Sequence, residues 1–476
     1  MTPARVPGAT AERRQSAARA IRGPVLTFTG NPFLHGVDQT LSFVRDALIV
    51  IEDGRIARFG AASTLSATLP SDTELESYGE DSLIMAGFID CHVHFPQIEI
   101  IGAGGGALLD WLGKYTFVAE ERFADAAHAR EAARVFFRES LRNGVTTSGV
   151  FCTVHAASVD ALFQEALALG LRTLAGKVLM DRNARTGLHD TAQTGYDASR
   201  ALIERWHGRE RLVYAITPRF AATSSPAQLE AAGALRAAHP ECFVQSHISE
   251  NRREVDWVRE LFPERKDYLD VYDHYGLVGE RTVYGHGIWL TERELRHCHE
   301  TGTAIAHCPT SNFFLGSGCF NLSNALAPER PLRVGLATDL GAGTSFSMLQ
   351  TMNAAYQAAQ INGHTLRAAE AFYLATRGGA HALYLDDAIG SIAPGMEADF
   401  VVLDLKSTPL IDYRLRHVSD LEEALHVQMT LGDDRAVRAT YAAGRKVYER
   451  DDRPGADLPA TPRRRQRVTR ARNDSR

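Results

Sequence analysis

The chain has little cysteine and no long apolar run. Its six cysteines are scattered over 476 residues without a CxxC pair, which argues against a disulfide framework and predicts reduced thiols in the cytoplasm. No apolar run approaches the roughly 20 residues that a membrane helix needs. The N-terminus has arginines but lacks the apolar core of a secretory signal. We therefore expect a cytoplasmic protein with no membrane partner.

The net charge of −6 hides two basic ends. Residues 460–476 carry seven arginines and one aspartate, and residues 1–22 carry five arginines and one glutamate, so the ends hold +6 and +4 and leave −16 for the body between them. An acidic body argues against nucleic acid as the main partner. We interpret 453–476 as a disordered basic tail, with a nucleic-acid or acidic-surface contact as the alternative. We interpret 1–22 as a disordered extension, with a transit peptide as the alternative.

Both ends of the folded part show a β pattern. Asp53-Gly54 lies between two apolar runs, and Gly444 lies between two others near the C-terminus. Glycine at such a position is a strong hairpin signal because it accepts the positive φ that the turn requires. The sequence therefore predicts one small β-sandwich domain built from both chain ends, residues 23–85 and 391–452.

The middle of the chain alternates short apolar strands with amphipathic helices. Eight strand–helix units over about 300 residues are typical of a (β/α)8 TIM barrel, which we expect over residues 86–390. An open doubly wound sheet is the alternative, but no Gly-rich phosphate loop follows the first strand, and we interpret 102–106 as a flexible active-site loop. The predicted strands are 86–90, 145–151, 173–180, 212–218, 242–248, 282–288, 304–309 and 333–339, and the predicted helices include 126–141, 159–169, 227–238 and 292–300.

Two histidines, His92 and His94, lie at the end of the first predicted barrel strand. Residues i and i+2 of a strand point to the same face, so both imidazoles can converge on one ion while Val93 points away. Imidazole is a common ligand of zinc and iron. An isolated HxH is equally compatible with two ordinary polar histidines, so further ligands are needed.

The carboxyl ends of the later strands supply those ligands, because chemistry in such barrels lies where the strands end. His247 and Asp339 complete a set of four with His92 and His94, and water would be the fifth ligand. We expect one zinc ion per subunit, with iron as the alternative. No lysine follows the fourth strand to bridge a second metal, which favours one ion.

Zinc lowers the pKa of bound water to near 7, and proton carriers must act beside it. Asp339 can take the water proton, and Glu250 can protonate a ring nitrogen or leaving group. His286 either orients the attacking water, which we favour, or is a further ligand. The other zinc deaminase signature, H-x-E with P-C-x-x-C, is absent, because His239-Pro240-Glu241 is followed by no P-C-x-x-C.

Six stretches resemble the amidohydrolase superfamily and, within it, the barrel-type guanine deaminases. The HxH motif and the aspartate after the eighth strand are superfamily-wide, whereas Phe95-Pro96-Gln97, Lys114-Tyr115-Thr116-Phe117 and Pro218-Arg219-Phe220 are narrower and point to guanine. Ala86 departs from the usual proline before Gly-Phe-Ile-Asp. The stretches are 87–97, 111–117, 217–220, 246–251, 306–312 and 338–343.

The resemblance implies hydrolytic deamination of guanine to xanthine and ammonia by a zinc-activated water, in purine catabolism. It implies zinc on the four ligands above, Glu250 and Asp339 as proton shuttles, and a homodimer. It also implies that Gln97 and Arg219 read the purine edge, that Phe220 packs on the ring, and that Trp111 lies in the substrate site. The rivals are an aminohydrolase or chlorohydrolase acting on a triazine, pterin or other purine, and a non-catalytic barrel, which tends to lose metal ligands.

Overall fold

The computed structural model describes residues 19–104 and 106–451. Residues 1–18 and 452–476, to which most of the expected extension and tail belong, lie outside the described part. Residues 19–22 were expected in the extension, but they begin strand β1 (Arg19–Phe28), with Ala20 and Ile21 fully buried. Their backbone pairs with residues 48–51 of β2. This pairing places Ala20 and Ile21 in the sheet, although an arginine lies on either side of them.

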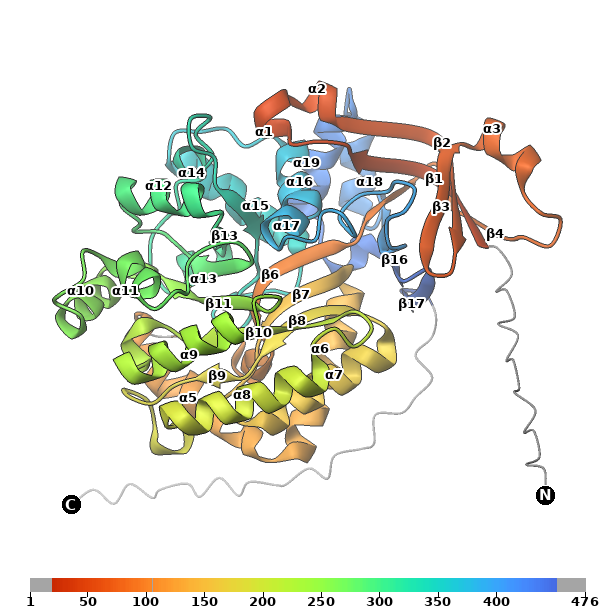
Figure 1. Ribbon diagram of the computed structural model, residues 1–476. Coiled ribbons are helices and arrows are strands. Elements are labelled where there is room, and N and C mark those ends of the chain that lie inside the picture. The colour runs from red at the N-terminus through yellow and green to blue at the C-terminus, as the bar shows by residue number, and fades with distance from the viewer. Residues whose placement is uncertain (1–18, 105, 452–476) are drawn as a thin grey trace, which may run out of the picture.

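The middle of the chain forms a barrel of eight parallel strands, which confirms the predicted fold class (Figure 1). Neighbouring strands are parallel. The short strand β9 (Val178–Leu179) pairs with β10, which also pairs with β8. The first and last strands meet just after β14, where Asp339 N donates to His92 O at 2.9 Å. The barrel strands are β6 (Phe88–His94), β7 (Val145–Phe151), β8 (Arg172–Gly176), β10 (Leu212–Pro218), β11 (Phe243–Ile248), β12 (Thr282–His286), β13 (Ala304–His307) and β14 (Arg333–Leu336).

Helices connect successive strands and cover the outside of the barrel (Figure 1). Many begin with a side-chain cap; Thr291 and Glu294, for example, form a capping box at the start of α12. The main connecting helices are α6 (Ala126–Arg142), α7 (Ala156–Leu169), α8 (Ala192–Trp206), α9 (Pro226–Ala238), α10 (Arg252–Leu261), α11 (Tyr268–His274), α12 (Glu292–Thr301), α13 (Pro309–Phe314), α15 (Met348–Ile361), α16 (Ala368–Leu374) and α17 (Arg377–Ala382).

A separate buried cluster takes residues from six barrel strands and from α17, among them Ile89, Cys91, Leu174, Phe243 and Val283. This packing fills part of the barrel and leaves the carboxyl ends of the strands as the place for a site.

The two chain ends build one mixed sheet in the order β17-β16-β15-β5-β1-β2-β3, with β4 paired to β1. All eight strands belong to one hydrogen-bonded sheet, in which only β4 lies off the main path. The second domain, expected as a sandwich, is therefore one continuous sheet by its pairing. Asp53 and Gly54, at φ 47° and 77°, make the first predicted hairpin turn, and Ala443 and Gly444, at 46° and 72°, make the second. The remaining bounds are β2 (Leu41–Glu52), β3 (Arg55–Ala61), β4 (Glu74–Ser77), β5 (Ser82–Ala86), β15 (Phe400–Asp404), β16 (Val437–Ala442) and β17 (Arg445–Glu449).

Strand β6 differs from its prediction because it extends through His94, so both histidines lie on the strand itself. Its register against β7 shifts between Asp90 and Val93. Cys91 belongs to the cluster that takes residues from six barrel strands, while Val93 packs in the larger cluster, which includes residues of the surrounding helices. The irregularity therefore re-aims the strand, as β-bulges beside active sites do.

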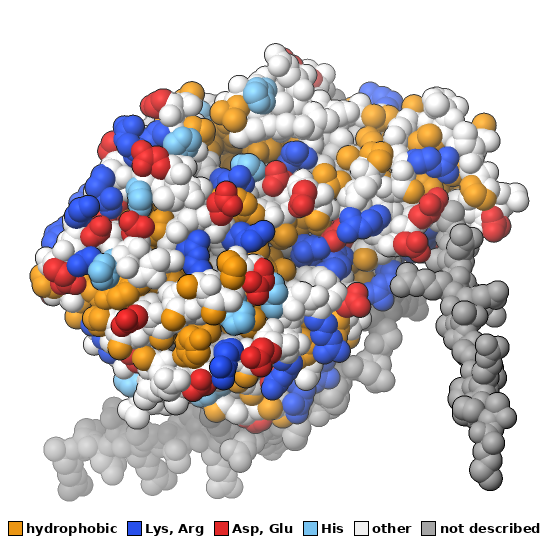
Figure 2. All heavy atoms as spheres, viewed as in Figure 1, with side chains coloured by type: hydrophobic (Ala, Val, Ile, Leu, Met, Phe, Trp, Pro, Cys, Tyr) orange, Lys and Arg blue, Asp and Glu red, His pale blue; other side chains and the backbone are white. Residues whose placement is uncertain are grey.

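Charges of both signs are interspersed over the face shown in Figure 2, with no large patch of one sign. In the described part of the chain, every helix is too short or too polar to cross a membrane.

Candidate active site

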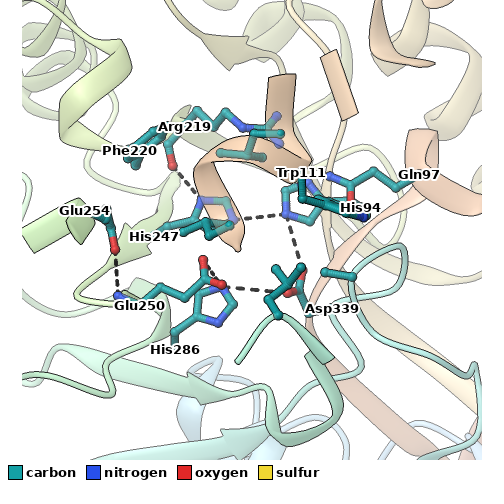
Figure 3. Close-up of a pocket in the computed structure, with 14 residues that line it drawn as sticks. His94, Gln97, Trp111, Arg219, Phe220, His247, Glu250, Glu254, His286 and Asp339 are labelled. Atoms are coloured by element: carbon teal, nitrogen blue, oxygen red, sulfur yellow. Dashed lines mark hydrogen bonds and ion pairs between the residues drawn. The ribbon is translucent and has the colours of Figure 1, made fainter. Parts of the chain in front are cut away.

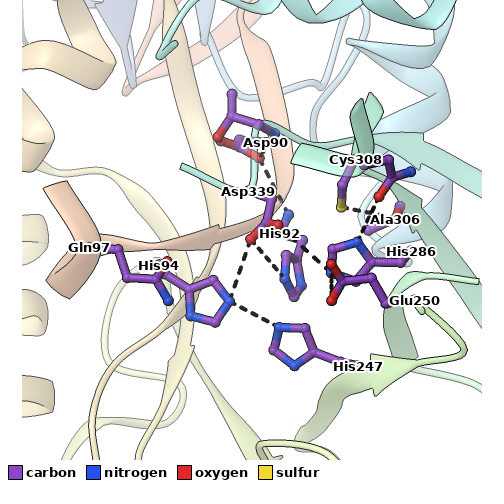
Figure 4. Close-up of polar contacts among 12 residues, drawn as sticks. Asp90, His92, His94, Gln97, His247, Glu250, His286, Ala306, Cys308 and Asp339 are labelled. Atoms are coloured by element: carbon purple, nitrogen blue, oxygen red, sulfur yellow. Dashed lines mark hydrogen bonds and ion pairs between the residues drawn. The ribbon is translucent and has the colours of Figure 1, made fainter. Parts of the chain in front are cut away.

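Three imidazoles and one carboxylate converge at the carboxyl end of the barrel (Figure 4). The Nε2 atoms of His94 and His247 lie 3.0 Å apart. The Nε2 atoms of His92 and His94 each lie 3.5 Å from Oδ1 of Asp339. The strand ends therefore bring together all four residues that the sequence analysis named as metal ligands.

The tautomer of His247 fits a bound cation. His247 Nδ1 lies 2.6 Å from the carbonyl oxygen of Arg219, which can only accept, so Nδ1 carries the proton and Nε2 keeps its lone pair. That lone pair faces His94 Nε2, and His92 Nε2 is buried without a hydrogen-bond partner. A lone pair of His247 that faces two further imidazole nitrogens and a carboxylate matches the donor set of a zinc site.

Electrostatics keep these groups in their metal-binding forms. Burial lowers the pKa of His92, and burial together with neighbouring imidazoles lowers the pKa values of His94 and His247 well below the ordinary range, so all three are neutral. Burial opposes ionisation of Asp339, but the adjacent imidazoles of His92 and His286 lower its pKa, so it is a carboxylate. Neutral imidazoles and an ionised carboxylate are the forms that bind a metal.

His286 and Glu250 form a second pair beside the ligands. His286 Nε2 lies 3.4 Å from Glu250 Oε2 and 3.8 Å from Asp339 Oδ2, and its Nδ1 bonds Asn312 Oδ1 at 3.0 Å. Burial opposes its protonation, but the two carboxylates outweigh burial and raise its pKa. A protonated imidazole donates and does not ligate, which supports the orienting role over the ligand role for His286.

Glu250 is positioned to exchange a proton near neutrality. Burial raises the pKa of its carboxyl to about 7, and Ser317 Oγ donates to Oε1 at 3.1 Å. Glu254 is a residue that the sequence analysis missed; it accepts from Glu250 N at 2.8 Å and from Tyr268 Oη at 2.7 Å. The capping-box spacing Asn251-x-x-Glu254 was the signal that could have found it.

Cys308 lies close to the candidate metal ligands but is not suited to bind metal. It forms a close donor group with His92, His286 and Asp339. Burial raises the pKa of its thiol well above the ordinary range, and Sγ donates to the carbonyl of Ala306 at 3.3 Å. A neutral, hydrogen-bonded thiol is a poor ligand, because the thiolate is the form that binds.

The backbone around the site is strained at several positions. His286, Asp339 and Ser249 have φ values of 73°, 46° and 50°, in the left-handed region that side chains other than glycine rarely adopt. Such outliers gather at functional sites. Gly285 is needed for a different reason, because a Cβ there would lie 2.7 Å from Cε1 of His92.

A cavity opens beside the candidate ligand cluster (Figure 3). All the predicted site residues except His92 line it. In this view Gln97, Trp111, Arg219 and Phe220 lie on the upper side, and Glu250, His286 and Asp339 lie on the lower side. Trp111 Nε1 donates to the carbonyl of Ala103 at 2.7 Å, which ties the glycine-rich segment to the pocket wall.

A second residue that the sequence analysis missed lies behind this wall. Glu120, in α5 (Phe117–Glu121), is fully buried and accepts from Arg219 Nη1 at 2.8 Å through both carboxylate oxygens. Gln97 Nε2 donates to the same carboxylate over 3.4 Å. Burial raises the pKa of Glu120, against the opposing effect of Arg219. No local pattern marked it, because its partners are 23 and 99 residues away.

Comparison with known proteins gives one consistent picture. A model described as the amidohydrolase family matches residues 83–447. The guanine deaminase of Escherichia coli strain K12 is 48% identical over 436 residues, covering 91% of this chain and 98% of that protein. The probable guanine deaminase of Deinococcus radiodurans is 40% identical over 420 residues, covering 87% and 95%.

Solved structures agree with these relatives. The structure of E. coli guanine deaminase superposes with a TM-score of 0.88 at 46% identity, covering 92% of this chain and 100% of that one. The guanine deaminase of C. acetobutylicum, solved with guanine bound in its active site, superposes with a TM-score of 0.81 at 27% identity, covering 90% and 100%.

Proposed function

The chain belongs to the amidohydrolase family, and we propose that it catalyses the hydrolytic deamination of guanine to xanthine and ammonia. The observation that carries the proposal is the meeting of a metal-ligand cluster with a buried amide, a guanidinium and aromatic walls in one cavity. The similarity to guanine deaminases over nearly the whole chain supports the same reaction. The proposed reaction belongs to guanine catabolism.

We assign His92, His94, His247 and Asp339 as ligands of one zinc ion per subunit, with iron as the alternative. The orphaned Nε2 of His92 and the facing Nε2 atoms of His94 and His247 support this set. A divalent ion held there lowers the pKa of a bound water toward neutrality and so supplies a nucleophile at physiological pH.

The protein's own groups handle the protons. Asp339 Oδ accepts a proton from the attacking water, whose oxygen forms a bond to C2 of guanine. Glu250, half in its neutral form near pH 7, protonates the adjacent ring nitrogen. The C2–amine bond then breaks, and the amine leaves as ammonia with the proton that Asp339 took from water. The proton that remains on the C2 hydroxyl passes to Glu250 as the carbonyl of xanthine forms, which restores both carboxyl groups. His286 donates toward the site and orients the water.

The upper wall of the pocket suits a flat, neutral heterocycle. Arg219 offers fixed donors to a carbonyl or ring nitrogen, and the Gln97 amide offers both a donor and an acceptor. Phe220 and Trp111 supply aromatic surface for a π face. Polar readout of this kind rejects analogues that lack the partner atom, which favours guanine over triazines that lack a ring carbonyl next to an N–H.

The test is a substrate panel with purified protein. Guanine, adenine, a pterin and an amino-triazine are incubated separately, ammonia release is measured, and metal content is determined in parallel. Guanine should be the best substrate, with about one zinc per subunit. Faster turnover of a triazine or pterin would replace this function with that of the rival aminohydrolases.

We also propose that the protein is a cytoplasmic homodimer. Its six cysteines are all free, which suits a reducing compartment, and the family resemblance implies the dimer. Light scattering on the eluting protein should give twice the 52.2 kDa chain mass.

A further inference from the structure

One buried carboxylate contacts both residues assigned to read the purine. Arg219 Nη1 donates to both oxygens of Glu120, and Gln97 Nε2 donates to Oε1. The guanidinium carbon of Arg219 also lies 5.4 Å from the ring centre of Phe117. Gln97 and Arg219 line the cavity, whereas Glu120 lies behind them. Glu120 therefore acts on a bound ligand only through these two side chains.

The contacts with Glu120 decide which atoms face the ligand. Because Gln97 Nε2 is directed at the carboxylate, its carbonyl oxygen is left to accept from a ligand N–H. In the described chain, the other guanidinium nitrogens of Arg219 have no protein acceptor, so they remain as donors. The wall thus presents an acceptor beside fixed donors, the pattern that matches a ring N–H next to a carbonyl.

Glu120 also offsets the charge of Arg219. Both side chains are almost completely buried, at 0% and 2% side-chain exposure, where charges interact strongly. Without the carboxylate, a lone guanidinium in the wall would attract anions. Xanthine is a stronger acid than guanine, because deamination places a ring N–H between two carbonyls, so the product forms an anion more readily than the substrate.

We propose that Glu120 is a positioning residue that makes the purine pocket select neutral guanine over anionic xanthine. Its carboxylate orients Gln97 and Arg219 toward the substrate and cancels the positive charge that would otherwise hold the ionised product. The inference rests on the proposed function, because it assumes that guanine is the substrate and xanthine the product.

The test compares Glu120→Gln with the matched control Glu121→Gln. Glu121 is the next residue, and its carboxylate pairs with Arg185 at 2.9 Å near the surface. For each protein, kcat and KM for guanine and the inhibition constant of xanthine are measured at about pH 6 and about pH 8.5, with metal content as a check.

Glu120→Gln should raise KM for guanine about tenfold or more, the effect of losing a charge-assisted hydrogen bond. At about pH 8.5, the ratio of the xanthine inhibition constant to KM for guanine should also be about tenfold lower in Glu120→Gln than in the wild type. Its metal content should stay unchanged, and Glu121→Gln should match the wild type. If Glu120→Gln weakened guanine and xanthine binding by the same factor, Glu120 would have only a structural role and the proposal would be wrong. The proposal would also be wrong if Glu120→Gln had the same constants as the wild type.

Glu120→Asp covers the case in which Glu120→Gln does not fold, because it keeps the charge but shortens the reach. It should raise KM for guanine without any gain in xanthine affinity. A wild-type KM, or a gain in xanthine affinity, would refute the proposal. If the wild-type protein itself does not deaminate guanine, the proposed function fails first, and the two failures are therefore distinguishable.

Discussion

Replacing Glu250 by glutamine removes the proposed proton donor with almost no change of shape. The side chain is buried and lies 3.4 Å from His286 Nε2 and 3.1 Å from Ser317 Oγ. Glutamine can still accept from Ser317 through its amide oxygen, so the local structure should persist. Because Glu250 is not among the assigned ligands, the metal should remain bound.

The expected loss follows from the role. General acid–base catalysis contributes about 10²- to 10⁴-fold, or about 2.7–5.4 kcal/mol in activation free energy. We therefore expect kcat for guanine to fall by that factor while zinc content stays at the wild-type level. Guanine loss is followed by ultraviolet absorbance, and metal by elemental analysis.

The matched control is Glu260→Gln, an exposed position on the neighbouring helix α10. Its kcat should equal that of the wild type. A Glu250→Gln protein with kcat within threefold of wild type would refute the proton-donor role. Loss of zinc in the same variant would show instead that Glu250 supports the ligand cluster.

Three further predictions concern pH and metal. Because the pKa of Glu250 is raised to about 7, its donor form is present below that pH and lost above it, so kcat/KM should decline between about pH 7 and pH 8.5; a flat profile would contradict this. His92→Ala should lose zinc, so adding a chelator should no longer lower its thermal midpoint. The wild-type protein should be destabilised by the chelator, because it loses the stabilisation that bound zinc gives, about 2.7 kcal/mol when the free zinc concentration is 100 times Kd. Gly285→Ala should weaken zinc binding about 10- to 100-fold by displacing His92, whereas Gly79→Ala, where a Cβ would meet nothing within 4 Å, should bind zinc normally.

The barrel was predictable because its signals are local. Each strand is a short apolar run, and strands β7 and β10 have the predicted bounds, Val145–Phe151 and Leu212–Pro218. The start of β1 and the end of β6 differ from their predictions, because pairing with neighbouring strands determines both. In β1, arginines flank buried residues, and in β6 a register shift carries the strand through the histidines.

The candidate site divides in the same way. Residues at strand ends, such as His247 and Asp339, could be named from the sequence because the barrel topology brings strand ends together. Glu120 could not, because its place depends on how the segment after β6 folds back over the mouth. The positive φ of Asp339 and His286 was equally hidden, because Asp and His adopt such a conformation more often than most residues but still only rarely.

Arg219 links the substrate wall to the metal ligands through two different parts of one residue. Its backbone carbonyl fixes the His247 tautomer at 2.6 Å, and its side chain is held by Glu120. The carbonyl contact does not depend on side-chain identity, whereas the proposed purine readout does. A change of side chain at this position should therefore alter substrate choice while the tautomer of His247 is preserved. The proposed metal site and the proposed substrate wall can therefore change independently at this residue.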